Sequence, residues 1–158
     1  MFKLQIKYLS FFFGIVSILS FFNILYSYYF NLYLNLDTYY FTFLASSILF
    51  ITFFKFGKYD IKSNIFQRIL TIFLGYLLIP LVLSIPFYFS IYNLTFSNSF
   101  FEAISGFTST GFTVFENIKL IDQSLIIWRS STQWIGGLYF LFSIIYLIDI
   151  YDDSFKKT

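Results

Sequence analysis

The chain has 158 residues, of which 58% are hydrophobic and only 11% charged, and its formal net charge is +2. Soluble domains carry about 25% charged residues, so the composition excludes an ordinary soluble protein and indicates an α-helical protein that crosses a membrane several times. The sequence contains neither cysteine nor histidine, which excludes disulfides, thiol or imidazole catalysis and the usual zinc and haem ligands.

The first two apolar runs predict a pair of spanning helices. The first run, roughly 8–30, has a signal peptide as its alternative, but such a peptide has an apolar region of only about 7–15 residues. This run is longer and ends in Tyr-Ser-Tyr-Tyr-Phe, which is typical of a spanning helix with an interfacial aromatic belt. The second run, 39–54, is short for a span, and Lys55 and Lys58 are expected to extend it by reaching the interface.

The other two apolar runs flank a more polar stretch. The third run, 69–92, contains Pro80 and Pro86, which membrane helices tolerate as kinks or ends, and Pro86 is expected to mark its outer end. The last run, 125–148, is followed by a charged tail.

The distribution of lysine and arginine predicts the orientation. Eight of the ten lie in the N-terminal start, the loop 55–68 and the C-terminal tail, whereas the loop 31–38 has none. By the positive-inside rule, both termini and the basic loop are expected in the cytoplasm, with the protein in the cell (inner) membrane.

The stretch 99–113 reads S-F-F-E-A-I-S-G-F-T-S-T-G-F-T and predicts a re-entrant segment. Ser99 and Glu102 fit a capping box, so we expect a short half-helix from about residue 100 that enters from the outer side. Its C-terminal end, near Phe107, then carries a partial negative charge that favours a cation. Two roles are open for Glu102: raising the cation concentration at the mouth of a pore, or simply capping the helix.

The second half of this stretch predicts an ion-binding filter. Thr108, Ser109, Thr110 and Gly111 are expected to run back outward in extended form, with their carbonyls replacing part of a cation's hydration shell. Gly111 supplies the backbone freedom that such a turn needs. The alternative is an ordinary polar loop between two spanning helices, because T-S-T-G alone is a weak signal.

The start of the last run carries two polar residues one helical turn apart, Arg129 and Gln133. They are predicted either to anchor the hairpin or a neighbouring repeat, or to anchor the helix at the interface together with Trp128 and Trp134. Both interpretations give these residues a structural supporting role.

Together these motifs resemble a known family. The segment 100–113, with I-P-F-Y at 85–88 before it and W-R-S-S-T-Q-W-I-G-G at 128–137 after it, resembles the first pore repeat of the TrkH/KtrB superfamily of potassium transporters. The resemblance covers roughly 68–137, and the preceding helices resemble the N-terminal pair of the TrkH branch. It implies four membrane–pore–membrane repeats in one full-length chain, with potassium bound at the Thr-Ser-Thr-Gly filter and Gly111 as the selectivity glycine. It further implies dimers and a cytosolic nucleotide-binding regulatory subunit of the TrkA kind.

The sequence departs from the family pattern at two motifs. The usual small residue after the filter glycine is Phe112 here, and the common Gly-Gly-Met-Gly reads Gly136-Gly137-Leu138-Tyr139. The two glycines are still expected to allow close helix packing. Only one pore repeat is present in this sequence, and three quarters of the expected pore are absent from it.

We therefore predict an all-α polytopic membrane protein with four transmembrane helices and one re-entrant pore helix. The expected divisions are an N-terminal helix pair with a cytoplasmic basic loop at 1–67, a membrane–pore–membrane repeat at 68–150 and a charged tail at 151–158.

The predicted function is potassium uptake by a TrkH-type subunit in short or truncated form. The alternatives are a homotetrameric cation channel and a non-conducting membrane remnant or interaction protein. Its expected partners are the lipid bilayer and further pore repeats or copies of itself. Because the acids are scattered and the basic residues form no large cluster, we predict no enzyme, no cofactor and no nucleic-acid binding.

Overall fold

The structure is a computed structural model that describes residues 6–57, 65–92, 94–118 and 121–155. For 149–155 it describes the backbone only. Some of the basic residues that entered the orientation prediction lie outside these ranges: Lys3, Lys58, Lys62, Lys119, Lys156 and Lys157.

All regular structure in these ranges is helical, which confirms the predicted all-α class. In chain order the described helices are α1 (Ile6–Tyr29), α2 (Leu36–Phe56), α3 (Ile65–Leu83), α4 (Ile85–Ser90), α5 (Phe96–Phe107) and α6 (Gln123–Phe155). Among the described residues, the stretches long and apolar enough to cross a membrane are Lys7–Tyr29, Leu36–Phe56, Ile65–Ser90 and Gln123–Ile148. The prediction of a polytopic membrane protein with four spanning helices is therefore confirmed.

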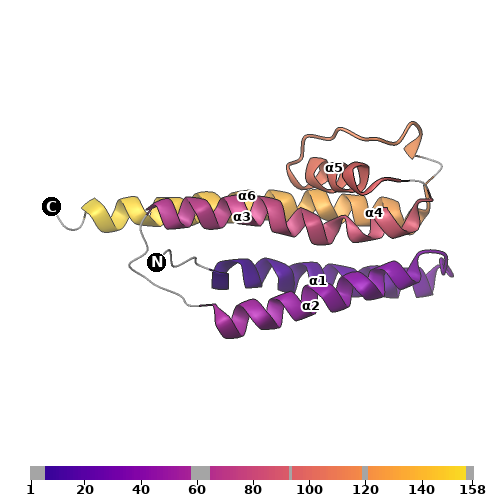
Figure 1. The fold of residues 1–158 in the computed structure, drawn as a ribbon, viewed down its shortest axis with the longest axis horizontal. Helices are drawn as coiled ribbons and strands as arrows, with labels where there is room; N and C mark the ends of the chain where they lie inside the picture. The colour runs from indigo at the N-terminus through magenta and orange to yellow at the C-terminus, as the bar shows by residue number, and fades with distance from the viewer. Residues whose placement is uncertain (1–5, 58–64, 93, 119–120, 156–158) are drawn as a thin grey trace.

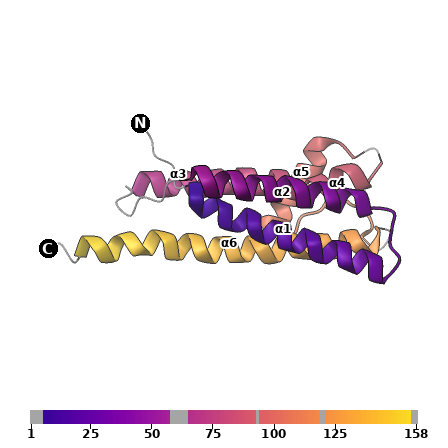
Figure 2. The same ribbon diagram turned by 90° about the horizontal axis from the view of Figure 1, so that it is seen from below.

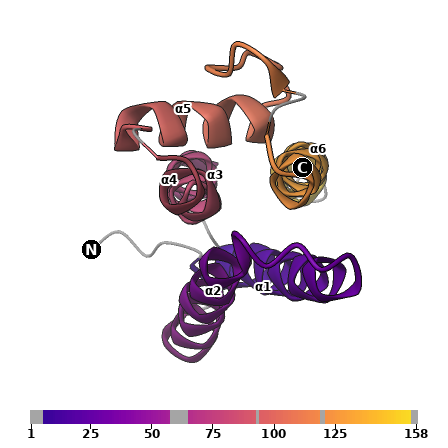
Figure 3. The same ribbon diagram turned by 90° about the vertical axis from the view of Figure 1, so that its right-hand side faces the viewer.

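The long helices lie side by side along one axis, with α3 and α4 forming one nearly continuous rod (Figure 1). Figure 2 shows α1 crossing from α2 toward α6, and it packs against both. In the view along the axis, α3, α4 and α6 form a middle layer that separates the α1–α2 pair from α5 (Figure 3). Helix α5 is short and crosses obliquely over α3 and α6, which both contact it.

Several predicted boundaries were wrong. Helix α2 begins at Leu36 and reaches 21 residues, so it is not a short span. Pro86 does not end the third span: it occupies the first turn of α4, where its missing N–H removes no hydrogen bond, and the helix continues to Ser90. The break lies one residue before α4, at Ser84. Helix α6 continues through Phe155, so most of the predicted tail is helical.

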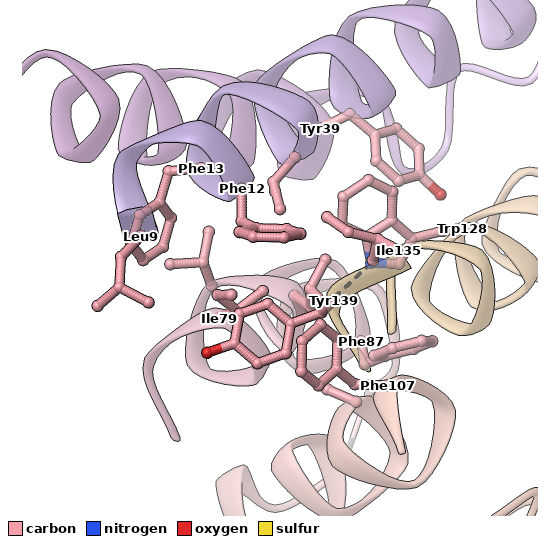
Figure 4. Close-up of a cluster of buried hydrophobic side chains, with 14 of the residues drawn as sticks. Leu9, Phe12, Phe13, Tyr39, Ile79, Phe87, Phe107, Trp128, Ile135 and Tyr139 are labelled. Carbon is pink, nitrogen blue, oxygen red and sulfur yellow. Dashed lines mark hydrogen bonds between the residues drawn. The ribbon is translucent and has the colours of Figure 1, made fainter. Parts of the chain in front are cut away.

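The core lies where α1, α3 and α6 meet beneath α5, and aromatic side chains dominate it (Figure 4). The ring of Tyr139 lies against Phe12, with ring centroids 4.7 Å apart, and against Phe107, at 5.3 Å. Trp128 is fully buried, and its indole N–H donates to the carbonyl of Leu83 at 3.0 Å. The interpretation of Trp128 as an interfacial anchor was therefore wrong, because its polar atom is satisfied inside the bundle.

A polar cluster joins the N-terminal pair to the start of α6. The Asn35 side-chain amide donates to the carboxylate of Asp122 at 2.7 Å, and the Ser124 hydroxyl donates to the same oxygen at 2.8 Å. The hydroxyl of Tyr39, on α2, donates to Ser124 at 3.0 Å. These bonds hold the α1–α2 turn against the segment that leads into α6.

Candidate functional site

Helix α5 begins earlier than the capping box predicts. Its N-cap is Thr95, whose backbone is extended and whose side-chain oxygen accepts a hydrogen bond from the N–H of Asn98 at 3.3 Å. Ser99 lies inside the helix, is buried, and donates to the carbonyl of Thr95 at 3.1 Å. The predicted cap at Ser99 was therefore wrong: the helix is capped by Thr95, which accepts from the N–H of Asn98, and the Glu102 side chain bonds elsewhere.

The end of α5 is closed by a Schellman motif. Ser109 donates its N–H to the carbonyl of Gly106 at 3.0 Å, and Thr110 donates to the carbonyl of Ser105 at 3.1 Å. Ser109 has a φ of 57°, a left-handed conformation that costs a residue with a side chain roughly 1–2 kcal/mol. Gly111, two residues further on, has a φ of 78°, which uses the backbone freedom expected of this glycine. The expectation of an extended segment was wrong at Ser109, where a residue with a side chain takes the left-handed conformation.

The four predicted filter residues, 108–111, are all exposed. In the part of the chain that the structure describes, no donor bonds to their carbonyl oxygens. Two of their side chains turn back onto α5 instead: the Thr108 hydroxyl donates to the carbonyl of Ile104 at 2.7 Å, and Thr110 donates to that of Ser105 at 3.2 Å. The segment therefore presents exposed backbone oxygens that are free to accept from another group.

Ser105 holds the far side of this turn. Its hydroxyl donates to the carbonyl of Phe112 at 2.6 Å and lies 3.1 Å from the hydroxyl of Thr110. The segment is thus tied to α5 both before and after Gly111, which limits the positions that its carbonyls can take.

Glu102 connects α5, the returning segment and α6. Its side chain is fully buried, and the guanidinium Nε of Arg129 donates to Oε1 at 2.6 Å. The hydroxyl of Thr113 and the N–H of Val114 both donate to Oε2 at 3.0 Å. A buried carboxylate is stable only when its lone pairs are met in this way. Glu102 is therefore neither the helix cap nor an exposed charge at a pore mouth.

The other polar and aromatic residues predicted nearby lie apart from this network. Gln133 is half-buried and makes no side-chain hydrogen bond to any described residue. Trp134 points outward, with 58% of its surface exposed. The structure thus brings Arg129 to the hairpin but not Gln133 or Trp134.

The two glycines of α6 have different surroundings. A Cβ added at Gly136 would overlap the carbonyl of Phe107, so only glycine lets α6 approach the end of α5 this closely. A Cβ at Gly137 would meet no atom within 4 Å. Gly137 faces an open cleft of about 490 Å³, which Thr108 and Ser109 also line.

Sequence reasoning missed the roles of Ser105 and Thr113, because their partners depend on the left-handed turn at Ser109. A signal for the Glu102–Arg129 pair was present. An acid in an apolar half-helix needs a compensating base, and Arg129 is the cation at the start of the next spanning helix.

Comparison with curated proteins finds relatives among cation transporters. The chain is 35% identical over 65 residues to an uncharacterized cation transporter of Methanocaldococcus jannaschii, which covers 41% of the chain and 14% of that protein. It is 33% identical over 82 residues to the Trk system potassium uptake protein TrkH of Escherichia coli, which covers 51% of the chain and 17% of TrkH. The match to TrkG of Escherichia coli is 41% identical over 46 residues, or 29% of the chain and 10% of TrkG.

The chain thus spans less than a fifth of the length of these relatives. Neither a family model nor, at a significant level, a solved structure matches it. Over the matched part of its length the chain is related to the Trk potassium uptake proteins, which confirms its resemblance to the TrkH/KtrB superfamily.

Proposed function

We propose that the chain takes part in potassium transport across the cell membrane, as a TrkH-type subunit in short or truncated form. The observation that carries this proposal is the exposed segment 108–111, whose carbonyls accept no hydrogen bond from any described residue and whose ends are fixed to α5. Backbone carbonyls in such a position suit a cation that has lost part of its hydration shell. The printed names of the relatives, which include potassium uptake proteins, support the same ion.

The backbone of this segment is not that of a regular strand. Thr108 has a φ of −84°, Ser109 of 57° and Gly111 of 78°. In a strand, successive carbonyls point to opposite sides. A departure from strand geometry is what the proposal requires if several carbonyls of one short segment are to face a single ion path.

One such segment cannot surround an ion, so the proposed pore includes further pore repeats or copies of the chain. Within it, 68–150 forms the membrane–pore–membrane repeat, with α5 as the re-entrant pore helix, and 1–67 forms an additional helix pair. Thr108, Ser109, Thr110 and Gly111 bind potassium in this proposal. The tail 151–158 and both termini lie in the cytoplasm, where a TrkA-type nucleotide-binding subunit is the expected regulatory partner.

A homotetramer is the second candidate. It is favoured by the open cleft beside the segment, because Gly137 and Phe140 leave room there for a neighbouring unit. Crosslinking of the chain in membranes distinguishes a homotetramer from a pore that is completed by other repeats. Crosslinked tetramers support self-assembly, and a purely monomeric chain contradicts it. A chain that neither assembles nor transports is the third alternative, a non-conducting remnant or interaction protein.

Rubidium uptake by cells that lack their own potassium transporters tests the proposal directly. Expression of the chain is expected to raise uptake, and Gly111→Ser to abolish the increase, because a side chain is strained at this φ and narrows the path. Equal uptake with the variant and the original chain contradicts the filter assignment. Western blotting of the membrane fraction is the control, because it shows whether the variant and the original chain are present in equal amounts.

A further inference from the structure

Two adjoining clefts lie near the turn that joins α1 and α2, one between the two helices and one on the surface of α2. The larger, of about 430 Å³, is apolar and is lined by Phe21, Leu25 and Tyr28 of α1 and by Tyr40, Phe43 and Leu44 of α2. The smaller, of about 170 Å³, shares Tyr40 and Leu44 with it and adds Asp37 and Phe41. The two clefts meet at Tyr40 and Leu44, and together we call them the groove. Its larger part is apolar, and its smaller part contains the Asp37 carboxylate.

The groove follows one face of each helix. Phe21, Leu25 and Tyr28 are spaced four and three residues apart on α1, and Tyr40 and Leu44 are spaced four apart on α2. From Phe21 to Tyr28 the groove extends about 10 Å along the helix axis. One leaflet of a bilayer contributes roughly 15 Å of hydrocarbon, so the groove covers most of the depth of a single leaflet.

The end of the groove that lies nearest the α1–α2 turn is polar. Asp37 lies in the first turn of α2, at the start of this span, and its side chain is exposed. The hydroxyls of Tyr28 and Tyr40 lie 2.9 Å apart across the groove. A carboxylate and two hydroxyls therefore lie at the depth of lipid headgroups, directly above an apolar cleft.

We infer that this groove binds one phospholipid with a primary ammonium headgroup, of the phosphatidylethanolamine class, from the leaflet on the side of the α1–α2 turn. The ammonium donates hydrogen bonds to Asp37 and lies against the rings of Tyr40 and Phe41. Because the hydroxyls of Tyr28 and Tyr40 are hydrogen-bonded to each other, one O–H of the pair remains to donate to the phosphate. One acyl chain fills the apolar cleft.

Charge and size argue against other occupants. The Asp37 carboxylate repels an anionic headgroup such as that of phosphatidylglycerol. The quaternary ammonium of phosphatidylcholine has no N–H to donate to this carboxylate. A helix from a second copy is about 10 Å across and many turns long, whereas this groove extends only about 10 Å before it reaches the charged residue. The inference does not depend on ion transport by the hairpin, which lies on the opposite side of the middle layer.

Native mass spectrometry of the complete chain with phosphatidylethanolamine, phosphatidylcholine and phosphatidylglycerol tests this site. The chain is expected to bind phosphatidylethanolamine most tightly, and Asp37→Asn to reduce its preference over phosphatidylcholine about tenfold, as the loss of one charge-assisted hydrogen bond predicts. Glu116→Gln, at another exposed carboxylate, is the matched control and is expected to change nothing. Equal binding of the three lipids, or an unchanged preference in Asp37→Asn, overturns the inference.

A second pair of variants tests the apolar cleft. Leu44 is 55% exposed and lines the cleft, so Leu44→Trp is expected to fill it without disturbing the core and to weaken binding of phosphatidylethanolamine. Ile48 is 59% exposed one turn further along α2 and does not line the cleft, so Ile48→Trp is expected to bind as the original chain does. Circular dichroism checks that each variant is folded. If Leu44→Trp instead leaves lipid binding intact and dissociates a dimer, the groove is an interface between copies and the inference is wrong.

Discussion

The guanidinium Nε of Arg129 lies 2.6 Å from the Oε1 of Glu102, and the carboxylate of this pair is fully buried. Glu102 belongs to the short helix α5 and Arg129 to the long helix α6, so the contact fixes the hairpin against a spanning helix. Its contribution to stability is testable because each partner can be changed separately.

Replacing Arg129 by leucine leaves the Glu102 carboxylate buried without its partner, which is expected to cost about 3–5 kcal/mol. The double change Glu102→Gln with Arg129→Leu is expected to cost less than Arg129→Leu alone, because no unpaired charge remains. Reversible unfolding of the purified chain in mixed detergent measures these free energies. Additive effects of the two single changes would show that the pair contributes no coupling.

Gly136→Ala and Gly137→Ala add the same methyl group to adjacent positions of α6. The first overlaps the Phe107 carbonyl and is expected to destabilise the chain by about 1–3 kcal/mol, as overpacking does. The second enters open space and is expected to stabilise α6 by up to about 1 kcal/mol, because alanine favours helix more than glycine. The same unfolding measurement distinguishes them, and similar values for both would contradict the close approach at Gly136.

Gly111 has a φ of 78°, which asparagine tolerates far better than a β-branched residue. If the backbone of 108–111 binds the ion, Gly111→Asn is expected to retain part of the rubidium uptake and Gly111→Val none. Western blotting of the membrane fraction controls for the amount of protein. Full uptake by the valine variant would contradict any need for this backbone conformation.

The two tryptophans of the chain report the packing of α6. Trp128 is fully buried and Trp134 is 58% exposed, facing away from the bundle. In vesicles that contain lipids with brominated acyl chains, the fluorescence of Trp134 in the Trp128→Phe variant is expected to be strongly quenched. Trp128 in the Trp134→Phe variant is expected to be shielded. Equal quenching of the two would contradict the buried position of Trp128.

The four spans were predictable because a long apolar run that must satisfy its own backbone in a membrane has few options other than a helix. The errors arose where a local motif competed with its surroundings. Ser99 and Glu102 match a capping box, but Thr95 precedes them and caps the helix first. Pro86 looked like a helix end, yet proline is also favoured in a first helical turn, which is where α4 uses it.

The candidate site was predictable in outline but not in its contacts. The resemblance singled out 108–111, and the structure finds these residues exposed at the end of a short helix. The partners of Glu102 could not be derived from spacing, since Thr113 and Arg129 lie 11 and 27 positions away in the chain. The contacts of Glu102 depend on how the chain reverses direction at Ser109. No sequence pattern predicts that a serine takes a left-handed conformation.

The length of helix α6 affects how its distal end is connected to the end of α5. Its 33 residues extend about 50 Å, well beyond the roughly 30 Å of hydrocarbon in a bilayer, and the helix has no break. Gly136 lies about two fifths of the way along α6 and touches the end of α5. Helix α6 ends at Phe155, about 28 Å further along its axis. Because Gly136 touches the backbone of Phe107 directly, any displacement of α6 at this point acts on the end of α5 without an intervening side chain.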